Sequence, residues 1–99
     1  EGVLTLTLKD QYYNMREMVE PHPEVIDKAF KAMEQAGVTP IVRPIRGGTD
    51  GARLSYMGLP CPNLFTGGMN FHGKFEYCSL DTVRRAQQTI LNLIQLWAE

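Results

Sequence analysis

The sequence has few of the features that assign a protein to a cellular compartment. It contains only two cysteines, Cys61 and Cys78, and neither belongs to a CxxC pair. A secreted domain of this size usually carries more disulfides, so we expect free thiols and a cytoplasmic location, with a single Cys61–Cys78 bridge as the alternative. The sequence also lacks a basic, apolar leader, and no apolar run approaches about 18 residues. We therefore expect no membrane partner.

An excess of charge of one sign is lacking as well. Ten Lys and Arg residues stand against eleven Asp and Glu residues, which gives a formal net charge of -1. A phosphate backbone is bound by a basic surface, so this balance predicts no nucleic-acid partner. The 99 residues, 43% hydrophobic and 21% charged, suit one ordinary globular domain and exclude a two-domain enzyme within this chain.

The first third of the chain predicts a strand, a crossing segment and a helix. Residues 1–9 carry Leu4, Leu6 and Leu8 in strict alternation with polar residues, which is typical of a half-buried strand. Residues 10–20 show no period and are expected to cross in extended form. A helix should begin near Pro23 and end at a Gly37 cap. Because the chain starts at Glu1 without Met, inside a strand pattern, we expect it to be part of a longer protein.

The remaining two thirds alternate between strand and helix patterns. Strands are expected at 38–45 and 61–66, a short helix at 52–57, and a long amphipathic helix at 80–98. Ser79 is a plausible N-cap for the last helix. Strands that alternate with helices in this way indicate an α/β fold, with a partly parallel sheet and helices packed on it.

The segment Arg46-Gly47-Gly48-Thr49-Asp50-Gly51 leaves a predicted strand and enters a helix. Open α/β sheets bind ligands at such places. Backbone N–H groups next to glycine, a helix N-terminus and a guanidinium together favour a carboxylate or phosphate. An equally good interpretation is a tight turn in which Thr49 only caps the helix and Arg46 points to solvent.

The two histidines have different surroundings. His72 lies in a glycine-flanked loop, where an imidazole can bind metal or transfer protons, or simply pack or face solvent. Glu76 can orient its ring or be a surface charge. His22, between two prolines at a helix start, is interpreted as structural. Together with the two cysteines, these residues have none of the paired spacings of a closed zinc site.

Three polar residues follow the first predicted strand. Tyr12, Tyr13 and Asn14 either line a binding cleft or pack at the end of the strand. Covalent catalysis is not expected, because there is no G-x-S-x-G motif and neither thiol has a basic neighbour.

A family resemblance rests on long stretches of sequence. Residues 44–68 and 70–74 resemble the C-terminal part of the tripeptide aminopeptidases, within the zinc-dependent peptidase family that includes carboxypeptidase G and several dipeptidases. Residues 10–17 and the terminal helix are similar too, so the resemblance covers essentially the whole chain. Phe71 and Phe75 depart from it, since relatives often carry Tyr and His there.

The resemblance implies the C-terminal portion of a dinuclear-zinc exopeptidase catalytic domain. Residues 1–15 would be the last strand of an inserted lid or dimerisation domain and the crossing segment. Residues 16–99 would complete the catalytic α/β domain. The intact protein would be a homodimer, and the segment alone would expose apolar faces and self-associate.

The resemblance also implies residue roles. His72 matches a ligand of one of two zinc ions, and Arg46 matches the residue that binds the peptide's C-terminal carboxylate. The other positions expected to bind substrate are Gly47, Gly48, Thr49, Asp50 and Asn14. The general base and the remaining ligands are expected upstream, so no catalytic residue is expected in this segment.

These roles predict an intact zinc metalloaminopeptidase that removes the N-terminal residue of tripeptides, whereas the segment alone should be inactive. The alternative is a non-catalytic carboxylate-binding or regulatory module that uses the Arg46 loop without metal.

Overall fold

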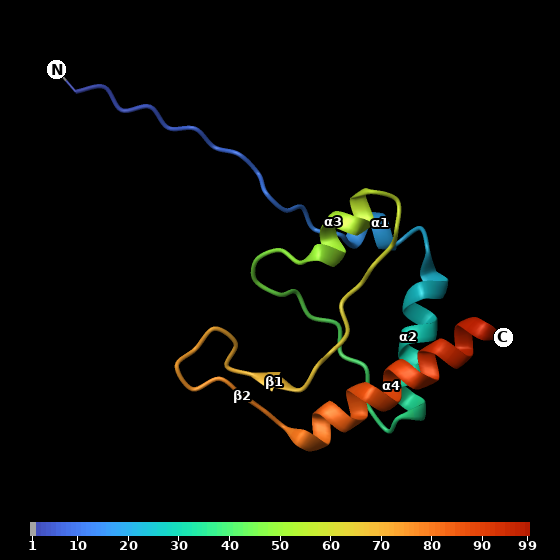
Figure 1. Cartoon of the computed structure of the whole chain (residues 1–99). Coiled ribbons are helices and arrows are strands. Elements are labelled where there is room, and N and C mark those ends of the chain that lie inside the picture. The colour runs from blue at the N-terminus through green and yellow to red at the C-terminus, as the bar shows by residue number, and fades with distance from the viewer. Residues whose placement is uncertain (1) are drawn as a thin grey trace.

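The computed structural model of the chain describes residues 2–99, so Glu1, where the first predicted strand begins, lies outside the described residues. The elements follow one another along the chain as Figure 1 shows. They are α1 (Arg16–Val19), α2 (Pro23–Gln35), α3 (Asp50–Tyr56), β1 (Gly68–Met69), β2 (Tyr77–Cys78) and α4 (Leu80–Ala98).

The helices begin and end at local signals. Pro23 occupies the first turn of α2, and Gly37 follows that helix with a φ of 74°, a conformation that glycine adopts without strain. The Ser79 side chain accepts a hydrogen bond from the Thr82 amide at the start of α4. The predictions for both long helices are confirmed. The short helix is confirmed too, although it begins two residues early, at Asp50.

Helices α2 and α4 cross and form the main packed unit (Figure 1). Their contact is built on small buried side chains, which let two helices approach closely: Ala29, Ala32, Ala86 and Thr89. Polar groups join the same two helices. Arg85 donates to the Gly37 carbonyl at 3.1 Å, and Lys28 donates to the Leu96 carbonyl at 3.1 Å. The Lys28 ammonium also lies 3.9 Å from the centroid of the Trp97 ring.

A second, smaller unit is formed by α1, α3 and the segment after α3. The Ser55 hydroxyl donates to the Gly51 carbonyl at 2.7 Å and accepts from the Cys61 amide at 2.9 Å. The Tyr56 hydroxyl donates to the backbone carbonyl of Asn14 at 2.9 Å. These bonds hold residues on both sides of α3 against that helix.

The α/β prediction is met in part, because helices and a sheet are present but the described sheet is not parallel. Within residues 2–99 the sheet has two strands, β1 and β2, which run antiparallel and pair Gly68 with Cys78 and Met69 with Tyr77. The segments 3–9, 38–45 and 61–66 are irregular. A strand needs a neighbouring backbone to pair with, and nothing in the described part of the chain offers one. The apolar side chains of the first two segments stay exposed: Leu4 is 94% and Val42 78% accessible.

The prediction of a fully extended crossing segment at 10–20 is also wrong, because α1 forms one helical turn within it. The reason is local. Asn14 Oδ1 accepts the hydrogen bond of the Arg16 amide at 2.9 Å, which satisfies a donor at the start of that turn.

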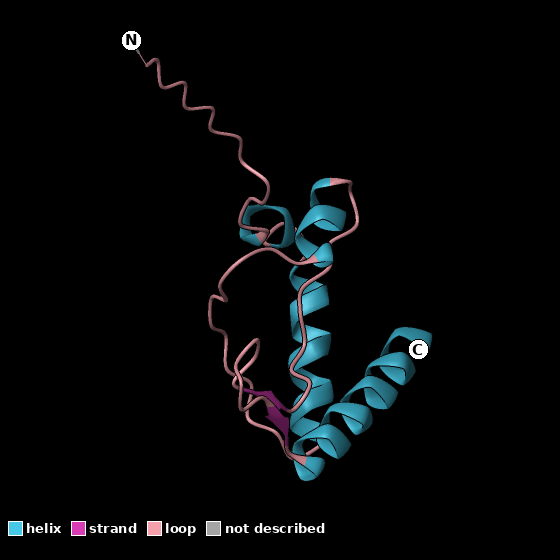
Figure 2. Ribbon diagram, turned by 60° about the vertical axis from the view of Figure 1, so that its left-hand side comes forward, coloured by secondary structure: helices cyan, strands magenta, loops and turns pink. Residues whose placement is uncertain are grey.

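The chain is expanded for its size. Its radius of gyration is 17.3 Å, whereas a globular chain of this length has about 13 Å. Figure 2 shows the short sheet and the long loops to one side of the helices, with the first residues extending away from the body. The apolar surfaces are therefore incompletely covered. Among residues 2–99 no helix is both long and apolar enough to cross a membrane.

Candidate functional site

The loop 46–49 carries the exposed Arg46 side chain to the start of α3. Gly47 has a φ of 74°, in the left-handed region that glycine favours. The Thr49 hydroxyl caps α3, since it accepts from the Ala52 amide at 3.4 Å, and it also accepts from Asn63 Nδ2 at 3.2 Å. Asp50 is the first residue of the helix and is exposed. Thr49 thus has the capping role that one interpretation gave it, while Arg46 stands at the surface.

Gly48 is needed because an aromatic ring lies directly on it. A Cβ atom at this position would be 1.9 Å from Cγ of Tyr12. The Tyr12 ring also faces the Arg53 guanidinium, whose carbon is 5.9 Å from the ring centroid. Tyr12, from the segment before α1, is therefore in contact with the glycine loop, although the two are far apart in sequence.

An open cavity of about 230 Å³ adjoins this contact, and it is mostly apolar. Its lining residues come from the segment before α1, from α3 and from the residue that follows α3: Gln11, Tyr12, Tyr13, Ala52, Arg53, Tyr56 and Met57. Tyr12 and Tyr13 thus line an open cavity beside α3. They do not pack at the end of a strand, because residues 3–9 are irregular.

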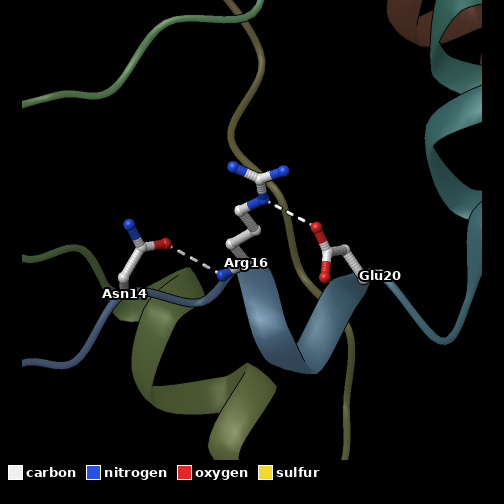
Figure 3. A network of polar contacts seen from close by, with 3 residues as sticks. All are labelled: Asn14, Arg16 and Glu20. Atoms are coloured by element: carbon white, nitrogen blue, oxygen red, sulfur yellow. Dashed lines mark hydrogen bonds and ion pairs between the residues drawn. The ribbon is translucent and has the colours of Figure 1, made fainter.

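Asn14 lies at the entrance to α1, as Figure 3 shows with its neighbours Arg16 and Glu20. Its side-chain oxygen accepts from the Arg16 amide, and its NH₂ group is available as a donor to a ligand. The nearby Arg16–Glu20 ion pair, 2.6 Å between Nε and Oε1, is 80% and 61% exposed. Exposed pairs of this kind contribute little to stability.

His72 lies in the loop between β1 and β2. Its φ is 62°, and that of Asn70 is 55°, so two non-glycine residues adopt the left-handed conformation in one short loop. The imidazole is exposed. No hydrogen bond joins Glu76 to the ring within the described residues; its carboxylate Oε2 accepts the backbone amide of His72 at 3.2 Å.

Both loops with predicted site residues project from the same side of the helices in Figures 1 and 2. Within residues 2–99 no hydrogen bond or ion pair joins Arg46 to His72. The described side chains also contain no group of three or more His, Cys, Asp or Glu residues that could hold a metal ion. His72 is therefore able to supply one ligand of a metal site and cannot complete it.

The remaining candidates are His22 and the two cysteines. His22 is the N-cap residue of α2 without a side-chain cap bond, and its Nδ1 lies 3.6 Å from Glu24 Oε1. Cys61 is half-buried and Cys78 exposed, both as free thiols.

The sequence analysis missed Tyr56. The single proton of its hydroxyl is shared between two acceptors, Glu17 Oε1 at 2.5 Å and the Asn14 carbonyl at 2.9 Å. The hydrogen bond to Glu17 raises the pKa of Tyr56 from 10.0 to about 12, helped by desolvation and by the negative charge of Glu17. The only sequence signal was the spacing of Ala52 and Tyr56, which places both on one face of α3.

Comparison with known proteins gives one consistent class, since the chain is similar over its full length to peptidases. No family model matches it. The relatives are named peptidase T. The chain is 61% identical over 99 residues to peptidase T of Clostridium perfringens, of which it covers 24%. Identity is 56% over 99 residues for the proteins of Alkaliphilus oremlandii and Bacillus licheniformis, again with 24% covered.

The matched region is the C-terminal part of those relatives. The resemblance stated from the sequence is thereby confirmed. The chain spans about a quarter of the length of the curated relatives it matches, 24% in each of these three cases.

Proposed function

We propose that this chain acts as the C-terminal part of a zinc-dependent aminotripeptidase, in which it supplies one metal ligand and the loop that binds the substrate's carboxylate. The observation that carries the proposal is the identity of 56–61% to peptidase T over the whole chain. The exposed imidazole of His72 and the exposed guanidinium of Arg46 support it, because both are accessible to groups outside this chain.

Arg46 would bind the C-terminal carboxylate of a short peptide. A guanidinium presents two parallel N–H groups to two carboxylate oxygens, which fixes direction as well as distance. Gly47 leaves the backbone beside it open, whereas the Tyr12 ring covers Gly48, and Thr49 and Asp50 follow at the helix start. The NH₂ group of Asn14 is the remaining donor proposed to meet the substrate. Holding the far end of a tripeptide in this way orients its scissile bond.

His72 would hold one of two zinc ions through a neutral ring nitrogen. When bound, such ions polarise a carbonyl and lower the pKa of a bound water to about 7. The other ligands and the general base would come from residues outside this chain; the described side chains contain no group of three metal-binding residues. The chain alone should therefore be inactive.

The proposal extends to the fold of the longer protein. Residues 1–15 would belong to a lid or dimerisation domain, and residues 16–99 to a catalytic α/β domain whose sheet is partly parallel. The exposed apolar side chains of Leu4, Leu6, Ile41 and Val42 support it, because pairing with further strands would cover them. A cytoplasmic homodimer is part of the same proposal.

Zinc dependence of the full-length protein tests the proposal. Chelation should abolish tripeptide hydrolysis, and His72→Ala should lower it by more than about 100-fold. Loss of a residue that hydrogen-bonds to a metal ligand already costs about 10–100-fold, and loss of the ligand itself should cost more. His22→Ala is the matched control and should keep full activity. Hydrolysis that survives chelation and His72→Ala would refute the proposal. Binding of tripeptides without hydrolysis would instead identify a non-catalytic carboxylate-binding module.

A further inference from the structure

The backbone of the β1–β2 loop is held in an unusual shape where it carries His72. Asn70 and His72 both have positive φ values, 55° and 62°. Side chains with a Cβ atom disfavour this region, although Asn and His enter it more readily than most. The direction of the Cα–Cβ bond of His72 depends on that conformation. A group that holds the backbone in this conformation therefore also helps to set the direction of the imidazole.

Several hydrogen bonds close the loop without touching His72. The Gly73 amide donates to the Asn70 carbonyl at 2.9 Å, and the Glu76 amide donates to the Gly73 carbonyl at 3.2 Å. At the open end of the hairpin, the Ser79 amide, which follows β2, donates to the carbonyl of Gly67, which precedes β1, at 3.0 Å. These bonds set the ends of the loop and leave the His72 peptide unit to be fixed by another group.

That group is the carboxylate of Glu76. Its Oε2 atom lies 3.2 Å from the backbone nitrogen of His72, which makes it the one side chain in the described part of the chain that bonds to this peptide unit. A hydrogen bond from an amide to an ionised carboxylate is stronger than one between neutral groups. Within the described residues the carboxylate makes no hydrogen bond to the ring, so both ring nitrogens stay available to other groups.

We propose that Glu76 is the positioning residue for His72: its carboxylate holds the His72 amide, and so keeps the imidazole pointing toward the metal. This inference rests on the proposed function of His72 as a zinc ligand. It assigns Glu76 a role that a merely charged surface residue would not have, and one that differs from orientation of the ring through a ring N–H.

The test uses Glu76→Ala and Glu76→Gln in the full-length protein. Gln keeps an acceptor oxygen without the charge, whereas Ala removes the acceptor. Glu34→Ala is the matched control, because Glu34 is exposed on α2 and its carboxylate has no partner within residues 2–99. Two readouts are compared: hydrogen exchange of the His72 amide in metal-free protein, and the affinity for Zn²⁺ together with the visible spectrum of the Co²⁺-substituted protein.

We expect Glu76→Ala to speed exchange of the His72 amide about tenfold, the change that loss of a single exposed, charge-assisted hydrogen bond produces. Zinc affinity should fall by about 10-fold or more, with an altered Co²⁺ spectrum. Glu76→Gln should recover most of both effects, and Glu34→Ala should change neither.

The inference is overturned if Glu76→Ala leaves the exchange rate unchanged, or if it lowers stability while zinc affinity and the Co²⁺ spectrum stay as in the parent. Failure of the proposed function looks different. The parent protein itself would then bind no zinc, while the exchange of the His72 amide would still report whether Glu76 holds it.

Discussion

Asn92 on α4 donates its side-chain amide to the backbone carbonyl of Ala32 on α2, across a distance of 3.1 Å. Both residues are buried. The side-chain oxygen of Asn92 in turn accepts from Gln88 Nε2 at 2.9 Å. This polar link fixes the register of the two helices at the place where their small residues meet, because sliding α4 by one residue would leave these buried groups unpaired.

Replacing Asn92 should therefore weaken the helix pair in a graded way. Asn92→Leu removes both side-chain hydrogen bonds and should lower the free energy of unfolding by about 2 kcal/mol. Asn92→Asp replaces the donor by a charged acceptor facing a carbonyl, and should cost about 3 kcal/mol. Urea unfolding, followed by the fluorescence of the single tryptophan, Trp97, measures both.

Gln95→Glu is a suitable control for the charge, since Gln95 is exposed on the same helix. It should change the unfolding free energy by less than about 0.5 kcal/mol. Equal stability of Asn92→Asp and the parent would show that the interface is not formed as described.

Gly51→Ala should destabilise the unit around α3, although alanine is the better helix former. In an open helix this change would stabilise by about 1 kcal/mol. Here the added Cβ would lie 2.4 Å from the carbonyl oxygen of Cys61. Both atoms are fixed to the backbone, so a side-chain rotation cannot relieve the clash. Displacing backbone in a packed contact costs about 1–3 kcal/mol, so the clash wins.

Thermal unfolding of the Gly51→Ala variant measures this balance. Gly2→Ala serves as its control, because the space around Gly2 is open and no clash follows. A Gly51→Ala variant that unfolds at a higher temperature than the parent would mean that the segment after α3 does not lie against Gly51.

How far the sequence predicts the structure depends on the range of the interactions. The helix ends at Pro23, Gly37 and Ser79 were predictable because the cap and the helix lie within a few residues of each other. The expected strands at 38–45 and 61–66 were not met, because alternation and β-branched residues indicate only that a segment can pair, while the pairing needs a distant backbone.

The same reasoning applies to the site. The turn and cap around Thr49 were visible in the sequence as local chemistry. The bond from Tyr56 to the Asn14 carbonyl joins residues 42 positions apart, and the bond from the His72 amide to the Glu76 carboxylate depends on the left-handed loop. Neither follows from residue types and spacing alone.

The Tyr56 hydroxyl should lose its proton at unusually high pH. Its hydrogen bond to Glu17 raises its pKa from 10.0 to about 12. A raised pKa means that the folded protein favours the protonated form. The associated stability is therefore fully present below about pH 10, and it is lost as the pH rises through about 12.

Absorbance titration of the phenol groups tests this, with Tyr56→Phe used to identify the contribution of Tyr56. Glu17→Gln should bring the pKa down toward 10, since it removes the charged acceptor. A Tyr56 phenol that titrates near 10 in the parent, or that is unaffected by Glu17→Gln, would contradict the described bond.

Arg46→Lys should impair hydrolysis of tripeptides by the full-length protein although the positive charge remains. An ammonium is a point charge and cannot bind both carboxylate oxygens in parallel. We expect kcat/KM to fall about 10-fold or more, which corresponds to the loss of about 1.4 kcal/mol of transition-state binding.

The substrate itself provides the sharper comparison. A tripeptide with an amidated C-terminus lacks the carboxylate, so the parent and Arg46→Lys should hydrolyse it equally slowly. Arg84 lies at an exposed position on α4 and has no ion pair in the described residues. Arg84→Lys should therefore leave kcat/KM unchanged for both substrates. If Arg46→Lys lowered kcat/KM by the same factor for the acid and the amide, Arg46 would be acting on some other part of the protein or the peptide, and the carboxylate-binding role would be wrong.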